Sequence, residues 1–225
     1  MIQLDNIRKV FRTEEVETIA LGGVTMSVNE GEFVAIMGPS GCGKSTLLNI
    51  LGLLDNPCEG SYKLAGTEVA DLKERDRTQI RKGQVGFVFQ SFNLIDELNV
   101  EQNVELPLKY VGVPKKERNE RIDMYGEMLG ITDALALPIS EYSHGMKQKV
   151  AIISALVHAP KLILMDEPFV GLDPSASHQL KQLMKKHCEE GGAIFFSTHV
   201  LEEAEKLCHK VAIIKGGNLV ASGTM

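Results

Sequence analysis

The most informative segment of the chain is Gly38-Pro39-Ser40-Gly41-Cys42-Gly43-Lys44-Ser45, which fits the pattern G-x-x-x-x-G-K-[ST] and continues into Thr46. A continuous apolar run, Phe33–Met37, precedes it and predicts a strand buried on both faces. The residues that follow, Lys44–Leu54, carry leucines at helical spacing and predict a helix. This strand–loop–helix order is the context that the pattern requires, and it argues against a chance glycine-rich turn.

The chemistry of this segment indicates phosphate binding. Glycines allow the backbone to curl so that successive N–H groups point inward, and the start of the helix adds a partial positive charge. The sequence therefore predicts a nucleotide site in which Lys44 reaches the β- and γ-phosphates and Ser45 holds Mg²⁺. We expect nucleotide to be bound by Gly38, Ser40, Gly41, Cys42, Gly43, Lys44, Ser45 and Thr46.

A second element supports this prediction, because the apolar run Leu162–Met165 is followed directly by Asp166 and Glu167. In a parallel α/β sheet, ligands bind beyond the carboxyl ends of the strands, where the glycine-rich loop also lies. We expect Asp166 to join the Mg²⁺ shell and Glu167 to orient or deprotonate an attacking water. Alone, a strand that ends in acids is a common solvated edge; paired with the loop, it favours hydrolysis of the nucleotide.

The remaining pattern predicts an α/β fold. Val24–Val28 and Gly60–Val69 look like early strands, residues 100–157 are mostly helical, and strands then alternate with helices up to a hairpin turn at Lys215–Asn218. Such alternation predicts a parallel sheet covered by helices. We therefore predict a mainly parallel core sheet, an N-terminal antiparallel β part and a helical insertion. The expected division is a core of residues 1–95 and 160–225 and a helical subdomain of residues 96–159.

Composition excludes several other classes. The 225 residues include 24 basic and 30 acidic side chains, a net charge of -6, which disfavours nucleic-acid binding through a generally basic surface. The longest stretch without a charged side chain, Gly83–Ile95, is too short and too polar to span a bilayer. The segment Met1–Phe11 carries charges where a signal peptide needs apolar residues, and the four cysteines lack metal-ligand spacing.

Ahead of the acidic strand end, Tyr142–Lys149 reads Tyr-Ser-His-Gly-Met-Lys-Gln-Lys and resembles the signature motif of ATP-binding cassette (ABC) ATPases. The common form of that motif is Leu-Ser-Gly-Gly-Gln. Ser143 and Gly145 keep its serine and second glycine, whereas His144 and Met146 depart from it in a form associated with some exporter cassettes. A serine and a glycine N–H at a helix start can also donate hydrogen bonds to a phosphate, although they serve equally as an ordinary helix cap.

Other elements of the same family follow in order. Gln90 matches the glutamine that touches Mg²⁺ or water and contacts the permease, and Gly171-Leu172-Asp173 matches the loop that pairs across the dimer. His199 matches the switch histidine that senses the γ-phosphate. Phe11 lies where the family stacks an aromatic ring on adenine, although a place in the core would also suit it. The resemblance spans nearly the whole chain, from Met1 to about Gly223.

The resemblance implies a mechanism as well as a fold. Two cassettes of this family enclose two ATP molecules, each between the phosphate loop of one chain and the signature motif of the other. Ser143, Gly145 and Asp173 would thus act across a homodimer or a paired cassette, while Glu167, His199, Gln90 and Lys44 carry the catalysis. ATP and Mg²⁺ are the implied cofactors, with Ser45, Gln90 and Asp166 at the metal. The implied partners are membrane permease subunits, reached from the cytoplasmic side, with no direct contact to nucleic acid and no insertion of this chain into the membrane.

The two halves of the chain resemble different subfamilies. The front half is similar to cassettes of lipoprotein release and macrolide export, and the part after about Leu135 is similar to another exporter group. The segments concerned are Gly52–Asp55, Gln90–Ile95 and Asn103–Leu108 in front, and Tyr142–Lys149 and Ser197–Glu205 behind. We hypothesise a chimeric or truncated cassette with a junction between Met124 and Pro138 and little activity alone. Natural divergence is the alternative.

Two other functional classes stay open at this point. An ABC ATPase that acts on nucleic acid or ribosomes usually carries two cassettes, long coiled coils or zinc modules, and none is evident here. A kinase or GTPase with the same phosphate loop would not combine Gln90, Ser143, Gly145 and His199 in this order.

Overall fold

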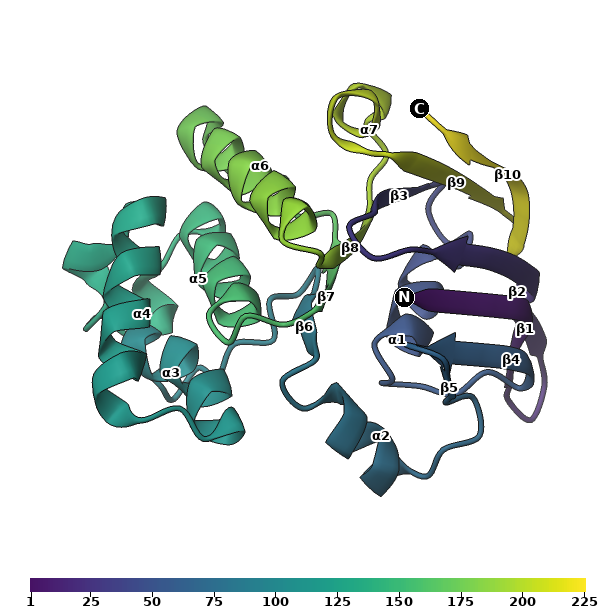
Figure 1. The fold of residues 1–225 in the computed structure, drawn as a ribbon, viewed down its shortest axis with the longest axis horizontal. Helices are drawn as coiled ribbons and strands as arrows, with labels where there is room; N and C mark the ends of the chain where they lie inside the picture. Colours follow the sequence, from purple (N-terminus) through teal and green to yellow (C-terminus); the bar gives the residue numbers. More distant parts are fainter.

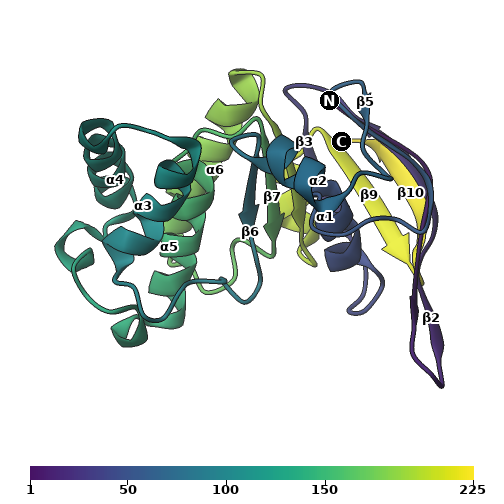
Figure 2. The ribbon, with the colours of Figure 1, turned by 90° about the horizontal axis from the view of Figure 1, so that it is seen from below.

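The computed structural model describes all 225 residues and contains two β-sheets (Figures 1 and 2). The antiparallel sheet has the order β2-β1-β4-β5, and the mainly parallel sheet has the order β10-β9-β3-β8-β7-β6. The antiparallel strands are β1 (Ile2–Arg12), β2 (Glu17–Val28), β4 (Glu59–Leu64) and β5 (Thr67–Glu68). The strands of the second sheet are β3 (Phe33–Met37), β6 (Val85–Val88), β7 (Leu162–Asp166), β8 (Ala193–Ser197), β9 (Lys210–Lys215) and β10 (Asn218–Thr224).

The helices form distinct groups around these sheets. In Figure 1, α3, α4 and α5 gather at the left, on the far side of the parallel sheet from the antiparallel sheet at the right. Helix α1 contacts β7 and β8 as well as β2, so it lies between the two sheets. The helices are α1 (Lys44–Leu51), α2 (Glu74–Arg81), α3 (Val100–Val111), α4 (Lys115–Leu129), α5 (His144–Leu156), α6 (Pro174–Glu189) and α7 (Leu201–Leu207), with 3-10 turns at Thr132–Ala134 and Ile139–Glu141.

The parallel sheet separates two apolar cores. Successive residues of a strand point to opposite faces. In β3, Phe33 and Ala35 join the core shared with the helical side, whereas Val34 and Ile36 join the core shared with α1 and the antiparallel sheet. Because both faces are covered, the central strands are apolar throughout rather than alternating, which is why the sequence pattern identified them.

The predicted α/β class is confirmed, with its antiparallel part, mainly parallel sheet and inserted helices. Two local predictions were wrong. The helix predicted to reach Leu54 ends at Leu51, because Leu53 adopts a left-handed φ of 57°. The single strand predicted over Gly60–Val69 is a hairpin of β4 and β5, since Ala65 and Gly66 turn the chain with φ of 48° and 82°.

Two elements had no sequence signal that we recognised. Strand β1 and the first part of β2 were missed because their pairing contains several register shifts, which interrupt the alternation of apolar and polar residues. Helix α2 was missed because none of its residues is buried, so it shows no apolar stripe. Both elements border functional regions described below.

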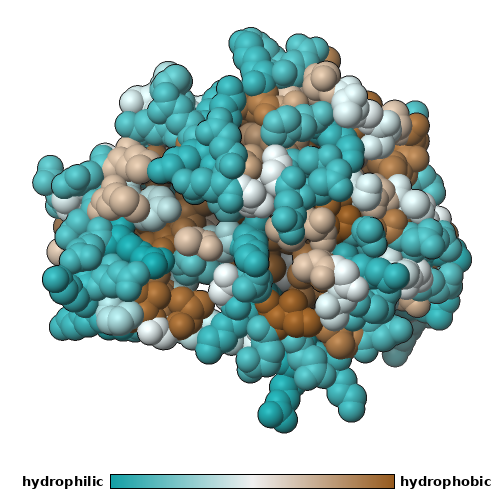
Figure 3. Space-filling view, in the orientation of Figure 1, coloured by the Kyte–Doolittle hydropathy of each residue, from teal (hydrophilic) through white to brown (hydrophobic).

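None of the helices combines the length and the apolar character that crossing a bilayer requires. Figure 3 shows a mostly hydrophilic face with scattered hydrophobic patches, some of which lie beside the hollow between the helical side and the sheets.

Candidate functional site

The glycine-rich loop forms the turn between β3 and α1, at the carboxyl end of a central strand. Gly43 has a φ of 104°, and a Cβ there would lie 2.4 Å from the carbonyl oxygen of Ala20, so only glycine fits. The first bond of the α1 ladder runs from the Leu47 N–H to the Gly43 carbonyl (2.9 Å). The N–H groups of residues 44–46 therefore point out of the helix start without a backbone acceptor, as phosphate binding requires.

Lys44 is held within this loop. Its side chain is buried, and Nζ donates to the carbonyl oxygens of Gly38 (2.8 Å) and Pro39 (3.0 Å). The ammonium group thus lies inside the curl of the backbone, beside the free N–H groups. The thiol of Cys42 is buried below the loop, 3.9 Å from Nζ of Lys44, and is the one predicted loop side chain that does not line the cavity.

The two predicted carboxylates lie at the end of β7, opposite the loop. Asp166 is 8% exposed, and its Oδ2 accepts a hydrogen bond from Oγ of Ser45 (2.7 Å). Glu167 follows with a left-handed φ of 50°, and its Oε1 lies 3.3 Å from Nδ1 of His199. Ser197, which the sequence did not single out, donates its hydroxyl to Oδ1 of Asp166 and accepts the Glu167 N–H (3.0 Å). Loop, carboxylates and histidine thus form one connected site.

These groups line one cavity of about 600 Å³. Besides the loop, the cavity is lined by Gln90, the two carboxylates, His199 and Phe11, so residues from distant parts of the sequence meet as predicted. Residues 18–20 of β2 complete the wall next to Phe11. They carry no motif, and only the pairing of Phe11 with Thr18 brings them there.

Phe11 is 47% exposed rather than part of the core. Nζ of Lys9 lies 5.3 Å from the centroid of its ring. An exposed aromatic face at the rim of a phosphate site is free to stack on a flat heteroaromatic group. This placement favours the binding interpretation of Phe11 over the structural one.

The donor set of the cavity fits a hard divalent cation. Ser45 and Asp166 bring their side-chain oxygens together at 2.7 Å, and the amide of Gln90 lines the same space. Oxygen ligands of this kind suit Mg²⁺, which usually combines one or two carboxylates with phosphate oxygens. No group of three or more His, Cys, Asp or Glu side chains in the chain is arranged so that it could hold a metal ion by itself.

Besides Cys42, three predicted residues do not line this cavity. Ser143 caps α5 by accepting the Met146 N–H (3.4 Å). Asp173 caps α6 by accepting the Ala176 N–H (2.8 Å), and this bond, followed by Lys149, lowers the pKa of the Asp173 carboxyl. Gly145 packs so closely against Gly171 that a Cβ would lie 2.4 Å from the Gly171 carbonyl oxygen. Within one chain, these residues belong to a surface separate from the phosphate loop.

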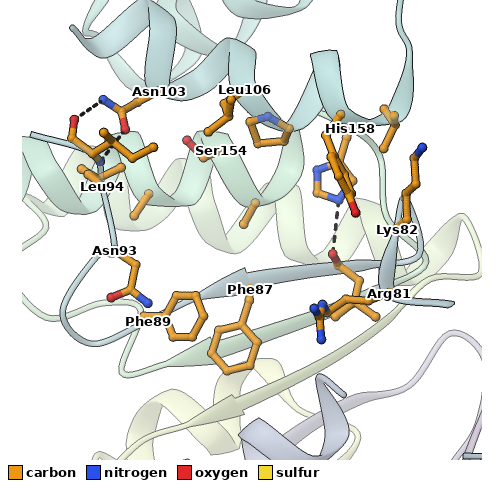
Figure 4. Close-up of a pocket in the computed structure, with 18 of the residues that line it drawn as sticks. Arg81, Lys82, Phe87, Phe89, Asn93, Leu94, Asn103, Leu106, Ser154 and His158 are labelled. Carbon is orange, nitrogen blue, oxygen red and sulfur yellow. Dashed lines mark hydrogen bonds between the residues drawn. The ribbon is translucent and has the colours of Figure 1, made fainter. Parts of the chain in front are cut away.

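A second cavity of about 400 Å³ lies between β6 and helices α3 and α5, next to the Gln90 loop (Figure 4). Figure 4 shows Phe87 and Phe89 on one wall, with their ring centroids 4.1 Å apart, and Leu106 and His158 on the other. Asn103 fixes the loop at its end by bonding both the N–H and the carbonyl of Ile95 (2.8 and 3.0 Å). We refer to this cavity as the interlobe groove.

Comparison with known proteins identifies the family. The profile of the family described as "ABC transporter" matches residues 21–170. The uncharacterized ABC transporter ATP-binding protein YknY of Bacillus subtilis is 40% identical over 224 residues, which cover 100% of this chain and 97% of YknY. The macrolide export ATP-binding/permease protein MacB of Azoarcus is 38% identical over 221 residues, 98% of this chain but 34% of MacB. A solved dimeric structure of the cassette MJ0796 bound to ADP and Pi superposes with a TM-score of 0.94 at 36% identity and covers 100% of this chain and 98% of that one.

The chain belongs to the ABC transporter family. The predicted ABC ATPase fold is confirmed, and so is an ATP-binding, ATP-hydrolysing cassette of a transporter. The relatives favour this function over a nucleic-acid or ribosomal ABC protein and over a kinase or GTPase.

Proposed function

We propose that this chain uses the 600 Å³ cavity to hydrolyse Mg²⁺-bound ATP and thereby drives an exporter-type or envelope-type permease. One observation supports the chemistry most directly: the curled loop with its free N–H groups faces Asp166, Glu167 and His199 in a single cavity. The N–H groups that would bind phosphate and the carboxylate that would act as a base therefore line the same cavity.

The roles of the residues follow from their positions. Lys44 and the loop N–H groups hold the phosphates, and Phe11 stacks on the adenine. Ser45, Asp166 and Gln90 would hold Mg²⁺, which when bound neutralises phosphate charge. Glu167 is placed to accept a proton from the attacking water, with its carboxylate oriented by His199 at 3.3 Å.

A second cassette would complete each site. Ser143, Gly145 and Asp173 lie outside the cavity of their own chain, which supports their action on the nucleotide of a second copy or of a paired cassette. The dimeric structure of MJ0796, bound to ADP and Pi, is a precedent for a dimer in a chain of the same fold. Asp173 is already fixed for such a role, because the Ala176 N–H and Nζ of Lys149 (2.9 Å) hold its carboxylate.

The interlobe groove is the surface that we assign to the permease. It is lined by twelve hydrophobic residues among twenty-one and adjoins Gln90, so an apolar helix docked there would lie beside the nucleotide site. We propose that the chain works at the cytoplasmic face of the membrane. The assignment of the groove is also consistent with the proposed division into a core of residues 1–95 and 160–225 and a helical subdomain of residues 96–159. These two parts form the opposite walls of the groove.

The exporter type rests on relatives such as MacB, whose name describes macrolide export. The similarity of the front half to lipoprotein-release cassettes stays a prediction. So does the recombination of two cassettes between Met124 and Pro138, which a natural gene encoding both halves would contradict.

The variant Glu167→Gln tests this function. It keeps the size and hydrogen bonds of the side chain but cannot accept a proton, so we expect it to bind ATP, lose hydrolysis and accumulate as a dimer. The measurements are ATPase rate and molar mass by light scattering, with and without ATP; Glu15→Gln, an exposed site between β1 and β2, is the matched control. Hydrolysis at the parental rate would refute the base assignment, and equal turnover of GTP without ATP-dependent dimers would point to another class of NTPase.

A further inference from the structure

Ser197 links the two acidic residues of the site, Asp166 and Glu167, from the neighbouring strand. It is the last residue of β8, pairs in register with Asp166 of β7, and has no exposed surface. Its Oγ donates to Oδ1 of Asp166 and accepts the backbone N–H of Glu167 at 3.0 Å. One hydroxyl thus contacts the side chain of one acid and the backbone of the next.

The position of this hydroxyl is unusual for its strand. The four residues before it, 193–196, are apolar and fully buried, and a polar group at such depth costs free energy unless it is bonded. Its hydroxyl donates to the Asp166 carboxylate and accepts the backbone N–H of Glu167, so both of its hydrogen bonds go to the two acidic residues of the site. A serine that served only to fill the core would not require this arrangement.

The second oxygen of Asp166 is held from the opposite side. Oγ of Ser45, in the phosphate loop, donates to Oδ2 at 2.7 Å. The carboxylate is therefore fixed by two hydroxyls, one from α1 and one from β8, which together define the plane of the group. Ser45 must share its oxygen with the metal in the proposed function, whereas Ser197 is shielded from solvent and has no other partner.

Glu167 also depends on this contact. Its φ of 50° is unfavourable for a residue with a side chain, and such a conformation persists only where the surroundings impose it. The bond from its N–H to Ser197 fixes the peptide that turns the carboxylate toward His199. Without that acceptor the partly buried N–H would lose its hydrogen-bond partner.

We propose that Ser197 is a positioning residue that sets the metal-binding orientation of Asp166 and the water-facing orientation of Glu167 at the same time. This inference rests on the proposed function of the cavity. It assigns to β8 a role in the site besides that of carrying His199 at its end.

The test compares Ser197→Ala with Ile194→Val, a matched control that removes one buried methyl group from the same strand. At saturating ATP we expect Ser197→Ala to lower kcat roughly 10-fold to 100-fold, the range for loss of a hydrogen bond to a charged group. Ile194→Val should match it in loss of thermal stability but keep kcat within about two-fold.

A binding measurement separates positioning from plain destabilisation. In the Glu167→Gln background, a fluorescent ATP analogue is titrated with Mg²⁺ and with EDTA. We expect Ser197→Ala to weaken binding about 10-fold with Mg²⁺ and to leave the metal-free affinity unchanged, because Asp166 acts through the metal. Equal weakening in both conditions, or kcat equal to that of the Ile194→Val control, would overturn the positioning role.

Further outcomes separate a failure of the positioning role of Ser197 from a failure of the proposed function. If Ser197→Ala does not fold, Ser197→Cys replaces it, because cysteine keeps a weak donor of similar size. We expect the ATPase rate of Ser197→Cys to be lower than the parental rate but not zero; a parental rate would overturn the inference. If Glu167→Gln hydrolyses ATP normally, the proposed function fails and Ser197 loses its role with it. If Glu167→Gln is inactive while Ser197→Ala is normal, only the positioning role fails.

Discussion

The backbone N–H of Gly217 donates to the carbonyl oxygen of Cys42 at 3.1 Å, which ties the turn between β9 and β10 to the phosphate loop. The carbonyl oxygen of Gly217 in turn accepts the N–H of Gly22 in β2 (2.8 Å). One residue near the end of the chain therefore joins the loop to the strand that lines the nucleotide cavity. A turn that the sequence marked only by two adjacent glycines supports the site from behind.

We expect Gly217→Ala to weaken ATP binding, because a Cβ at this position would lie 2.8 Å from the carbonyl oxygen of Ala20 and push β2 away from the loop. Gly216→Ala is a matched control, since Gly216 also has a positive φ (54°) but faces open space. Both variants should lose about 1–2 kcal/mol of stability from left-handed strain. Only Gly217→Ala should lower ATP affinity, by about 10-fold in a fluorescence titration. Equal affinities for the two variants would show that the turn does not support the loop.

The turn also illustrates what local sequence could and could not predict. The loop at residues 38–45 and the acids at the end of β7 were predicted because each motif consists of a few consecutive residues. The strand or helix next to each motif can be recognised from the adjoining sequence. The roles of Gly217 and Ser197 depend on partners far away in the sequence, at Cys42 and Asp166. A glycine pair and a serine in an apolar strand have no pattern that points to such partners.

The same reasoning applies to the fold. The central strands were predicted because burial on both faces makes them continuously apolar. Strand β1 was missed because its bulges break the alternation, and only its pairing with β2 and β4 fixes its course. The wall of residues 18–20 was consequently missed with it. The pairing of β1 with β2, rather than any local sequence preference, positions residues 18–20 at the cavity.

Lys44→Ala is expected to lower ATP affinity at least about 10-fold, because the phosphates lose the only ammonium group held within the loop. Adenosine has no phosphate and should bind the variant and the parent equally through Phe11. Lys63→Ala, on the exposed face of β4, is the control and should bind ATP as the parent does. The assignment of Lys44 would be wrong if ATP affinity stayed within about two-fold of the parent.

Stability should decline in mild acid because of two partly buried histidines. Burial lowers the pKa of His158 and of His187 below the ordinary value of 6.5. The unfolded chain therefore binds more protons than the folded chain as the pH drops below 6.5, so the free energy of unfolding falls, by at most about 1.4 kcal/mol per pH unit for each ring. Urea unfolding between pH 7.5 and roughly 5 measures this slope. His187→Gln should reduce the slope, and His178→Gln, on the exposed face of α6, should not; identical slopes in all three proteins would contradict this account.

The separation of Ser143 from the cavity of its own chain predicts complementation between two inactive variants. Lys44→Ala disables the phosphate loop, and Ser143→Arg disables the signature surface, so each homodimer lacks both sites. A mixed dimer pairs the intact loop of one chain with the intact signature surface of the other, which restores one site of two. We expect ATPase activity to reappear on mixing, to a maximum of about one quarter of the parental rate at equal concentrations, because half of randomly formed dimers are mixed and each has one working site. The control mixes Lys44→Ala with Lys44→Ala/Ser143→Arg, which leaves no complete site. If the first mixture stays as inactive as this control, Ser143 does not act across the dimer.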